Sequence, residues 1–259
     1  MTSGAAEPAV LAERRDRILL VTLNRPDQRN AVNAAIAQGI ADALDELDAD
    51  TGLSIGVLTG AGKGFCSGMD LKAFVAGEDP TVPGRGFAGI TRRAADKPLI
   101  AAIEGFAVAG GLEVALACDL IVAARGARLG IPEVKRSLVA AGGGLLRLPR
   151  VLPRNLAMEM ALTGDLILAE RAHELGLVNR LTDAGGALPA ALELAETIAA
   201  NGPLALAATK RILTESADWP DAEFFDRQEA IAAPVRDSED AREGATAFAQ
   251  KRAPVWKGR

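Results

Sequence analysis

The sequence predicts an α/β fold that ends in a helical region, and three observations lead to this prediction. Strand-like apolar runs alternate with amphipathic helical segments in the first half of the chain. Its strands are nearly continuous in apolar residues, which is typical of a sheet covered on both faces. After Pro153 the pattern becomes mainly helical. A chain of 259 residues, 49% of them hydrophobic, suffices for one large domain with such an appendage.

The first strand–helix–strand unit covers residues 17–59. Residues 17–23 are rich in β-formers and stop at the turn signal Asn24-Arg25-Pro26-Asp27, which predicts a strand followed by a loop. A helix is expected from Asn33, a plausible cap, because apolar residues then recur at helical spacing until Gly52. Residues 54–59 form a short buried strand in this interpretation.

The unit is repeated in residues 98–123. We expect a strand over residues 98–103, a helix over 110–117 after a glycine pair, and a strand over 119–123. Between the two units, residues 76–86 have turn formers at nearly every step, which predicts a mobile loop. Such loops often border binding sites.

The C-terminal part is predicted to be helical, with only residues 177–181 strand-like. We place a boundary near residues 201–203, so that residues 1–200 form the core and residues 201–259 form the helical region, either as a unit or as an elaboration of one domain. The expected helices cover residues 155–162, 169–175, 187–200, 203–214 and 237–251.

Rare residues exclude several kinds of site. The chain has no Tyr and a single histidine, His173, which removes every metal site that needs two imidazoles. A Ser-His-Asp triad would have to use His173, whose surroundings are typical of an exposed helix turn. Cys66 and Cys118 stand far apart without partner ligands in spacing, so neither a disulfide framework nor a metal site is predicted. A reducing compartment fits this cysteine usage best.

Charge and hydropathy narrow the partners. A net charge of -5 argues against general nucleic-acid binding, although an anionic small ligand fits if a few Lys or Arg gather locally. The longest apolar region, residues 99–124, is interrupted by Glu104, Glu113 and Asp119, which argues against a membrane span. The first eight residues lack the basic and then apolar pattern of a secretory signal. We therefore expect a cytoplasmic protein.

Two glycine-rich turns each follow a strand and lead into a helix, at residues 64–71 and 107–113. Glycine there lets the backbone approach a ligand closely and leaves helix N-terminal N–H groups free for an anion or a polarised carbonyl. Neither turn matches a nucleotide phosphate motif. Each turn alone is more simply explained by packing, but together they supply two donors.

Two carboxylates are a second group of candidate functional residues. Glu113 lies in an otherwise apolar segment, where an unpaired carboxylate is costly to bury. Glu133 follows Gly130-Ile131-Pro132 at a predicted helix start, and its local sequence alone favours a first-turn acid that complements the helix dipole. Two carboxyls with different pKa values are able to act as general acid and general base on one substrate.

Several of these motifs, in order, resemble the signatures of the crotonase (enoyl-CoA hydratase/isomerase) superfamily. They are residues 65–72 (Phe-Cys-Ser-Gly-Met-Asp-Leu-Lys), residues 107–113 with Cys118-Asp119, and residues 130–133 (Gly-Ile-Pro-Glu). The similarity extends from residues 23–26 and 30–31 to residues 247–252, and so covers nearly the whole chain. The resemblance implies a spiral of ββα units with a C-terminal helical trimerisation region, hence a homotrimer or hexamer. It also implies an acyl-CoA substrate, whose CoA is part of the substrate, and no separate cofactor or metal.

The resemblance also assigns roles to single residues. The backbone N–H groups of Met69 and Gly110 would form an oxyanion hole around the thioester carbonyl, and Glu113 and Glu133 would be the catalytic acids. Lys72 would lie near the CoA phosphates. The expected substrate-binding residues are Gln28, Arg29, Ala31, Ser67, Met69, Asp70, Leu71, Lys72 and Gly110.

The reaction that this resemblance implies is the reversible addition of water to a trans-2-enoyl-CoA, which gives 3-hydroxyacyl-CoA in fatty-acid or related metabolism. Glu113 would activate water at C3 and Glu133 would deliver the proton to C2. Related isomerases commonly keep only the carboxylate at the Glu133 position, so the presence of both favours a hydratase. Residues 132–135 and 143–149 also look like the carnitinyl-CoA dehydratase branch. That activity, an enoyl-CoA isomerase and a non-catalytic acyl-CoA binder stay open, whereas a ClpP-like protease lacks a plausible triad.

Three departures from the family pattern leave the acyl-chain preference open. Met69 replaces the usual small residue after the glycine, and Ala109 replaces the first of three glycines. Ala140-Ala141 stands where many hydratases have Pro-Gly beside the catalytic water.

Overall fold

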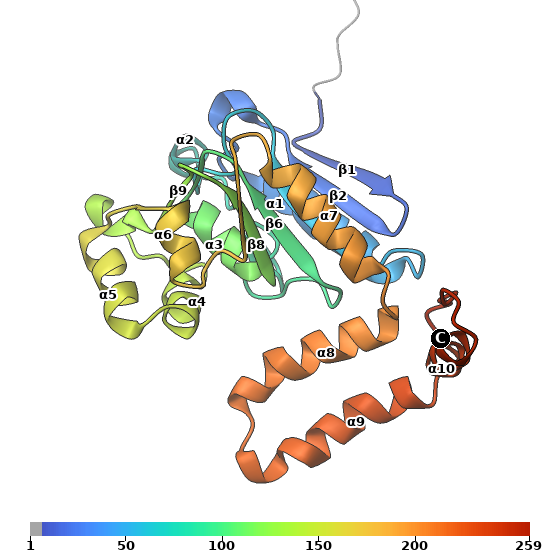
Figure 1. The fold of residues 1–259 in the computed structure, drawn as a ribbon. Helices are drawn as coiled ribbons and strands as arrows, with labels where there is room; N and C mark the ends of the chain where they lie inside the picture. The colour runs from blue at the N-terminus through green and yellow to red at the C-terminus, as the bar shows by residue number, and fades with distance from the viewer. Residues whose placement is uncertain (1–6) are drawn as a thin grey trace, which may run out of the picture.

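A six-stranded sheet forms the centre of the computed structural model, which describes residues 7–259 (Figure 1). Its strands have the order β1-β2-β3-β6-β8-β11, and only the β1–β2 pair is antiparallel. The predicted α/β fold is therefore confirmed. The residues on which we based the absence of a secretory signal fall mostly in 1–6, outside the described residues. The strands are β1 (Val10–Arg15), β2 (Ile18–Leu23), β3 (Ile55–Gly60), β6 (Leu99–Ile103), β8 (Leu120–Ala124) and β11 (Arg180–Thr182).

Both faces of this sheet are buried, which explains the continuous apolar runs. In β2, Leu19 and Val21 point into the main core with α1 (Ala34–Ala49) and α3 (Gly110–Ala117). Ile18 and Leu20 point to the opposite face, because successive strand residues alternate. There they pack against α7 (Ala187–Ala199), whose small buried side chains at every fourth position let the helix lie close to the strands; these are Ala191, Ala195 and Ala199.

Helix α1 begins as the sequence predicts. The side chain of Asn33 accepts a hydrogen bond from the N–H of Ile36 at 3.1 Å, which satisfies one of the free donors of the first turn. The helix α2 (Leu71–Val75) is short and begins after Asp70, whose side chain caps it. Helix α3 begins directly at the glycine pair, as expected.

Two smaller sheets lie beside the central one and were not predicted. Strand β7 (Phe106–Val108) runs parallel to β9 (Arg128–Gly130), which pairs with β10 (Ile167–Leu168). Within the segment expected to be a loop, β4 (Thr81–Val82) and β5 (Gly86–Phe87) form a tight hairpin. The mobility of this segment stays a prediction.

The helical second half is confirmed, with two additions. The structure contains α4 (Gly144–Val151), α5 (Arg154–Thr163), α6 (Ala169–Glu174), α8 (Pro203–Glu215), α9 (Phe224–Arg236) and α10 (Glu239–Ala249). Helices α4 and α9 were missed, and each contains an internal proline that ordinarily argues against a helix. Of the strand-like residues 177–181, only the last two belong to β11, and Leu177 and Val178 are buried before it. Within residues 7–259, no helix is long and apolar enough to cross a membrane.

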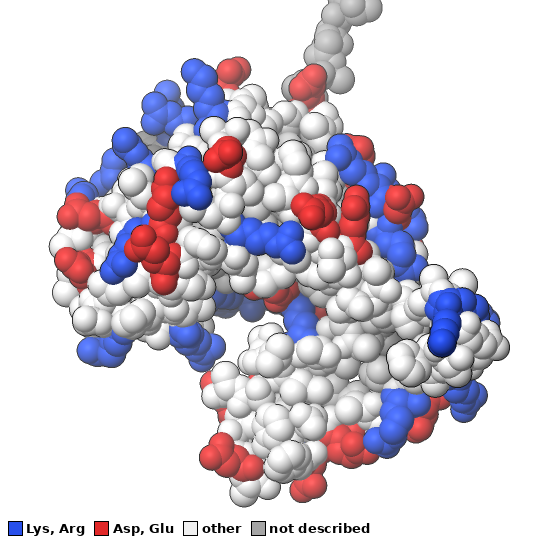
Figure 2. Space-filling view, in the orientation of Figure 1, with Lys and Arg blue, Asp and Glu red and all other residues white. Residues whose placement is uncertain are grey.

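Helices α8 and α9 extend away from the sheet as an antiparallel pair (Figure 1), and Figure 2 shows an opening between this pair and the core. The C-terminal tail then folds back on the start of α8. The indole N–H of Trp256 donates to the carbonyl of Ala200 at 2.8 Å. The carboxylate of Asp240, which is buried, accepts from the N–H groups of Lys257 and Gly258. The tail is thus fastened within the chain, and the domain division near residue 200 stays a prediction.

Candidate active site

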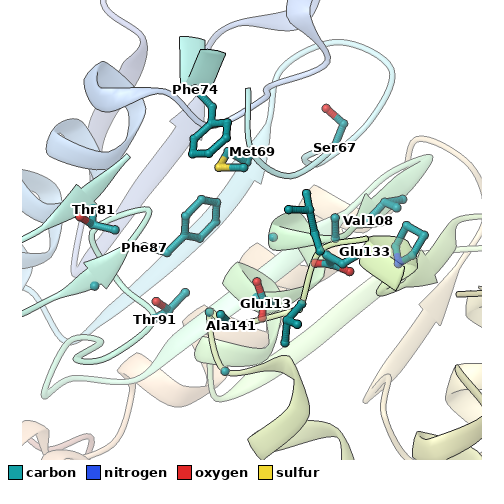
Figure 3. Close-up of a pocket in the computed structure, with 18 of the residues that line it drawn as sticks. Ser67, Met69, Phe74, Thr81, Phe87, Thr91, Val108, Glu113, Glu133 and Ala141 are labelled. Atoms are coloured by element: carbon teal, nitrogen blue, oxygen red, sulfur yellow. The ribbon is translucent and has the colours of Figure 1, made fainter. Parts of the chain in front are cut away.

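A cavity of about 1470 Å³ lies where the two glycine-rich turns meet the β4–β5 hairpin and the loop before α4 (Figure 3). This volume exceeds the roughly 300–1,000 Å³ of a pocket for a drug-sized ligand, so the cavity has room for a longer one. Among the residues singled out from the sequence, those that line it are Arg29, Ser67, Met69, Leu71, Gly110, Glu113 and Glu133. Gln28, Ala31, Asp70 and Lys72 are not part of the lining.

Asp70 stabilises the loop that follows Met69. One of its carboxylate oxygens accepts from the N–H groups of Lys72 and Ala73, and the other accepts from Arg25 at 3.0 Å. Burial alone would raise the pKa of Asp70, but the bonds from Ala73 and Arg25 hold it below its ordinary value. Lys72 is exposed at the start of α2. Asp70 therefore orders the loop, and neither residue is part of the cavity lining.

The N–H of Met69 is free because of the pairing of its neighbours. Val32 forms a parallel bridge with Met69, in which the N–H of Val32 donates to the carbonyl of Gly68 and the N–H of Asp70 donates to the carbonyl of Val32. In such a bridge the polar groups of the central residue point away from its partner. No protein acceptor in residues 7–259 binds the N–H of Met69.

Gly110 is the first residue of α3, so its N–H has no partner within the helix. The two turns approach closely because Gly68 has no side chain. A Cβ atom at Gly68 would lie 2.9 Å from the Cβ of Ala109 and 3.1 Å from the nitrogen of Gly110, and the φ of Gly68 is +93°. The absence of a side chain at Gly68 therefore lets the two turns lie against each other.

Ala109, between the two donors, carries backbone strain. Its φ is 54° and its ψ is -132°, a conformation that favours glycine. Ala109→Gly is expected to raise the free energy of unfolding by about 1 kcal/mol. Thermal unfolding followed by circular dichroism measures this, and Ala115→Gly, inside regular α3, is the control that should lower the melting temperature. A destabilising effect of Ala109→Gly would contradict the assignment of strain.

Glu113 is buried, with only 4% of its surface exposed, and it projects from α3 into a cradle of glycines. Its Oε1 accepts from the N–H of Gly144 at 2.9 Å. A Cβ at Gly142 would lie 2.6 Å from Oε2, so a side chain there would collide with the carboxylate. Burial raises the pKa of Glu113, opposed by the N–H groups of Gly144 and Gly142 and by the charge of Arg147.

Glu133 lies in the short 3-10 helix η2 (Pro132–Arg136), so the predicted helix start is a single tight turn. Its Oε2 is buried and has no hydrogen-bond partner among residues 7–259. Burial raises its pKa to about 7, opposed by its own backbone N–H, while the nearby charge of Glu113 raises it further and Arg136 lowers it. Glu133 is thus poised to hold and release a proton near neutral pH, and both carboxyls face the same cavity (Figure 3).

Basic groups gather around this cavity although the chain is acidic. Three of the residues that line the cavity are acidic and six are basic, namely Arg29, Arg92, Arg128, Lys135, Arg136 and Arg147. The local excess of positive charge suits an anionic ligand.

Three contributions were missed by the sequence analysis. The first is the run of glycines at 142–144 that cradles Glu113, and the second is Arg147 beside it. The third is Asn30, fully buried, whose side chain accepts from the N–H of Arg25 and donates to the carbonyls of Ala61 and Gly64, joining two loops of the site. For the first of these contributions the sequence offers a signal, namely three consecutive glycines at 142–144 that follow the isolated carboxylate Glu113 in the chain.

His173, Cys66 and Cys118 do not line the cavity. His173 is an exposed residue of α6 whose Nδ1 lies 2.8 Å from the carbonyl oxygen of Val178. Cys66 and Cys118 are buried free thiols, and burial raises the pKa of each to about 12. In the described part of the chain, no group of three or more His, Cys, Asp or Glu side chains is placed to hold a metal ion.

Comparisons with known proteins agree with the site. The sequence model of a family described as enoyl-CoA hydratase/isomerase matches residues 13–259. An enoyl-CoA hydratase of Mycobacterium tuberculosis is 43% identical over the whole of both chains. A carnitinyl-CoA dehydratase of Salmonella typhi is 42% identical over 95% of this chain and 97% of its own.

Solved structures give the same result. The crystal structure of an enoyl-CoA hydratase from Mycobacterium tuberculosis H37Rv is 62% identical, with a TM-score of 0.96 over 98% of this chain and 100% of that chain. A carnitinyl-CoA hydratase from Mycobacterium avium is 45% identical, with a TM-score of 0.79 over 97% and 99% of the two chains. Since the match in sequence and structure runs along almost the entire molecule, the chain belongs to the enoyl-CoA hydratase/isomerase family of the crotonase superfamily.

Proposed function

We propose that this protein is an enoyl-CoA hydratase, a hydro-lyase that adds water reversibly to a trans-2-enoyl-CoA. The observation that carries the proposal is the pair of shielded carboxyls, Glu113 and Glu133, on one cavity, beside two backbone N–H groups that have no acceptor in the described part of the chain. An isomerase needs one carboxyl and a binder needs none. A buried carboxylate in the apolar α3 is costly, which favours a catalytic use of both.

The proposed chemistry begins at the thioester. The N–H groups of Met69 and Gly110 hydrogen-bond the carbonyl oxygen, on which enolate charge develops as water adds. Glu113 accepts a proton from water while the water oxygen bonds to C3, and Glu133 donates its proton to C2. The product is 3-hydroxyacyl-CoA, with Glu113 protonated and Glu133 ionised until protons exchange with solvent. Dehydration reverses every step.

The pKa shifts of the two carboxyls suit Glu133 as the proton donor and Glu113 as the proton acceptor. A raised pKa of about 7 keeps a large fraction of Glu133 protonated near neutral pH, as a proton donor requires. Glu113 receives N–H bonds and the nearby charge of Arg147, which favour its ionised form against burial. The basic residues Arg29, Arg128 and Arg136, which line the cavity, also suit the phosphates of CoA.

The direct test is a hydration assay with 2-enoyl-CoA thioesters of increasing chain length. Loss of the ultraviolet absorbance of the conjugated enoyl thioester reports turnover. We expect turnover of at least one short or medium chain, and the chain-length profile then shows the effect of Met69. Tight binding of all thioesters without turnover would contradict the proposal and favour a binder.

A second candidate is the hydration of crotonobetainyl-CoA. Phe74 and Phe87 stand on either side of Met69 at one end of the cavity (Figure 3), and Asp79 also lines the cavity. Aromatic faces and a carboxylate attract a quaternary ammonium group. Including crotonobetainyl-CoA in the assay distinguishes this candidate, since a higher kcat/KM than for crotonyl-CoA would favour it.

The oxyanion role of Met69 is tested by removing only its N–H. Met69→Pro deletes this donor and is expected to lower kcat by about 10²–10³-fold. Met69→Ala keeps the donor and should retain most of the rate. Circular dichroism verifies that both variants fold, and a folded Pro variant with near-normal turnover would refute the role.

The exposed apolar side chains of the C-terminal helices support an oligomer, as the family resemblance implies. Leu213, Phe225 and Phe248 are 72%, 76% and 88% exposed. Such groups are costly in water unless another copy covers them. We expect the double variant Leu213→Glu/Phe225→Glu to give a smaller particle in light scattering. Arg211→Glu, on the same helix as Leu213, should leave the particle size unchanged. An unchanged particle size in the double variant would oppose this assembly.

A further inference from the structure

Arg147, on helix α4, links two walls of the cavity. Its Nη2 donates to the carbonyl of Thr91 at 2.6 Å, and its Nη1 donates to the carbonyl of Gly142 at 3.4 Å. Thr91 belongs to the segment that follows the β4–β5 hairpin, and Gly142 belongs to the loop before α4. The side chain is half-buried and faces the cavity.

The loop that Arg147 holds is the loop that holds Glu113. Gly144 donates its N–H to Oε1 of Glu113, and Gly142 lies so close that a Cβ there would stand 2.6 Å from Oε2. A displacement of this loop would therefore move or release the carboxylate. The planar guanidinium fixes the loop through a fork of donors, which a lysine ammonium does not reproduce.

Arg147 and Glu113 also interact through their charges. The positive charge of Arg147 lowers the pKa of Glu113 against the effect of burial. Burial lowers the pKa of Arg147, and the charge of Glu113 opposes that shift. The other titratable or charged groups around this pair are Glu133 with Arg136 on η2, Cys118 after α3, and Arg150 on α4. Glu133 has the same sign as Glu113 when ionised, so Arg147 is the charged neighbour that favours ionised Glu113, in addition to the N–H groups of Gly144 and Gly142.

We propose that Arg147 is a positioning residue for hydration, which holds residues 142–144 against Glu113 and keeps this carboxylate ionised to accept a proton from water. The inference rests on the proposed hydratase function. It assigns no contact between Arg147 and the reacting atoms. Its two parts, geometry and charge, are separable by substitution.

The test compares Arg147→Gln with Arg147→Lys. Gln keeps donors but removes the charge, so kcat should fall by about tenfold or more, and the acidic limb of the pH–rate profile should move to higher pH. The sign follows because the pKa of Glu113 rises when the positive charge is lost. Lys keeps the charge but not the fork, so kcat should fall while the acidic limb stays near that of the wild type. KM should change little in either variant.

Arg150→Gln is the matched control, because Arg150 is an exposed residue of the same helix, paired with Asp218. It should leave kcat and the pH profile near those of the wild type. Folded variants at Arg147 with an unchanged kcat and acidic limb would overturn the inference. Equal losses in both variants without a shift of the limb would reduce Arg147 to a structural role and also overturn it.

A readout that needs no turnover separates this inference from the proposed function. The amide resonance of Gly144 reports the ionisation of Glu113, because this N–H bonds Oε1. In a pH titration by NMR, its midpoint should rise in Arg147→Gln and stay near the wild-type value in Arg147→Lys. A wild type without hydratase activity would refute the proposed function, while an unchanged midpoint in Arg147→Gln would refute the influence of Arg147.

Discussion

Hydration is expected to fall by about 10²–10⁴-fold when Glu113 is replaced by Gln, the usual range for the loss of a general base. The amide keeps the shape of the side chain and still accepts the N–H of Gly144, but it cannot take a proton from water. Acyl-CoA binding should remain, since Glu113 makes no bond that holds the CoA in the proposed arrangement. Hydration assays and calorimetry on the same preparation measure the two quantities.

Glu78→Gln is a suitable control for this substitution. Glu78 is an exposed carboxylate near α1 that does not line the cavity, so its loss should leave kcat unchanged. A Glu113→Gln variant that hydrates enoyl-CoA at a rate close to the wild type would contradict the hydratase mechanism. If that variant still isomerised the double bond, an isomerase would be the better interpretation.

Glu133→Gln should also lower hydration by about 10²–10⁴-fold, and in addition it should stop any exchange of the C2 protons with solvent. This second loss separates the carboxyls, because only Glu133 is assigned to C2. In the wild type, kcat/KM for hydration should decline as pH rises through about 7, since Glu133 must carry a proton to donate it. A C2 exchange that survives in Glu133→Gln, measured by NMR in deuterated water, would oppose this assignment.

The same substitution has an expected effect on stability. An acid whose pKa rises from 4.5 in the unfolded chain to about 7 in the folded chain favours folding fully below pH 4.5, and this contribution is lost as pH rises through about 7. The amide in Glu133→Gln cannot ionise, so at pH 8 the free energy of unfolding of this variant should exceed that of the wild type by about 2 kcal/mol. This figure is reduced to allow for the partial exposure of the side chain. Denaturant unfolding at pH 4 and pH 8 measures the difference, which should be small at pH 4.

The central sheet was predictable because its strands carry apolar residues on both faces. Leu19 and Leu20 face opposite sides, and both are buried. Strand β1 was missed because it is an almost fully exposed edge strand, whose three apolar residues precede three charged ones and so form no alternating pattern. Helices α4 and α9 were missed because Pro149 and Pro234 lie inside them, a case in which tertiary packing outweighs local propensity.

The candidate site was predictable where a residue broke its local pattern. Glu113 in an apolar helix and the two glycine-rich turns met this condition, and the structure brings them to one cavity. The positions of Lys72 and Asp70 outside the lining were not foreseeable, because they follow from the cap of α2 and from the bond between Asp70 and Arg25. Arg147 supports Glu113 partly through its hydrogen bond to the carbonyl of Thr91, which is distant in the sequence. Such a long-range contact leaves no pattern in the local sequence.

The most direct test of the account is to identify the product formed by the wild-type protein from a short 2-enoyl-CoA in deuterated water. The account predicts 3-hydroxyacyl-CoA that carries one deuterium at C2, because the proton from Glu133 comes from solvent and is delivered once to that carbon. Mass spectrometry and NMR detect both features. A product whose double bond has moved without gaining oxygen, or a thioester recovered unchanged in a tight complex, would contradict the central claim that two carboxyls add water across the double bond.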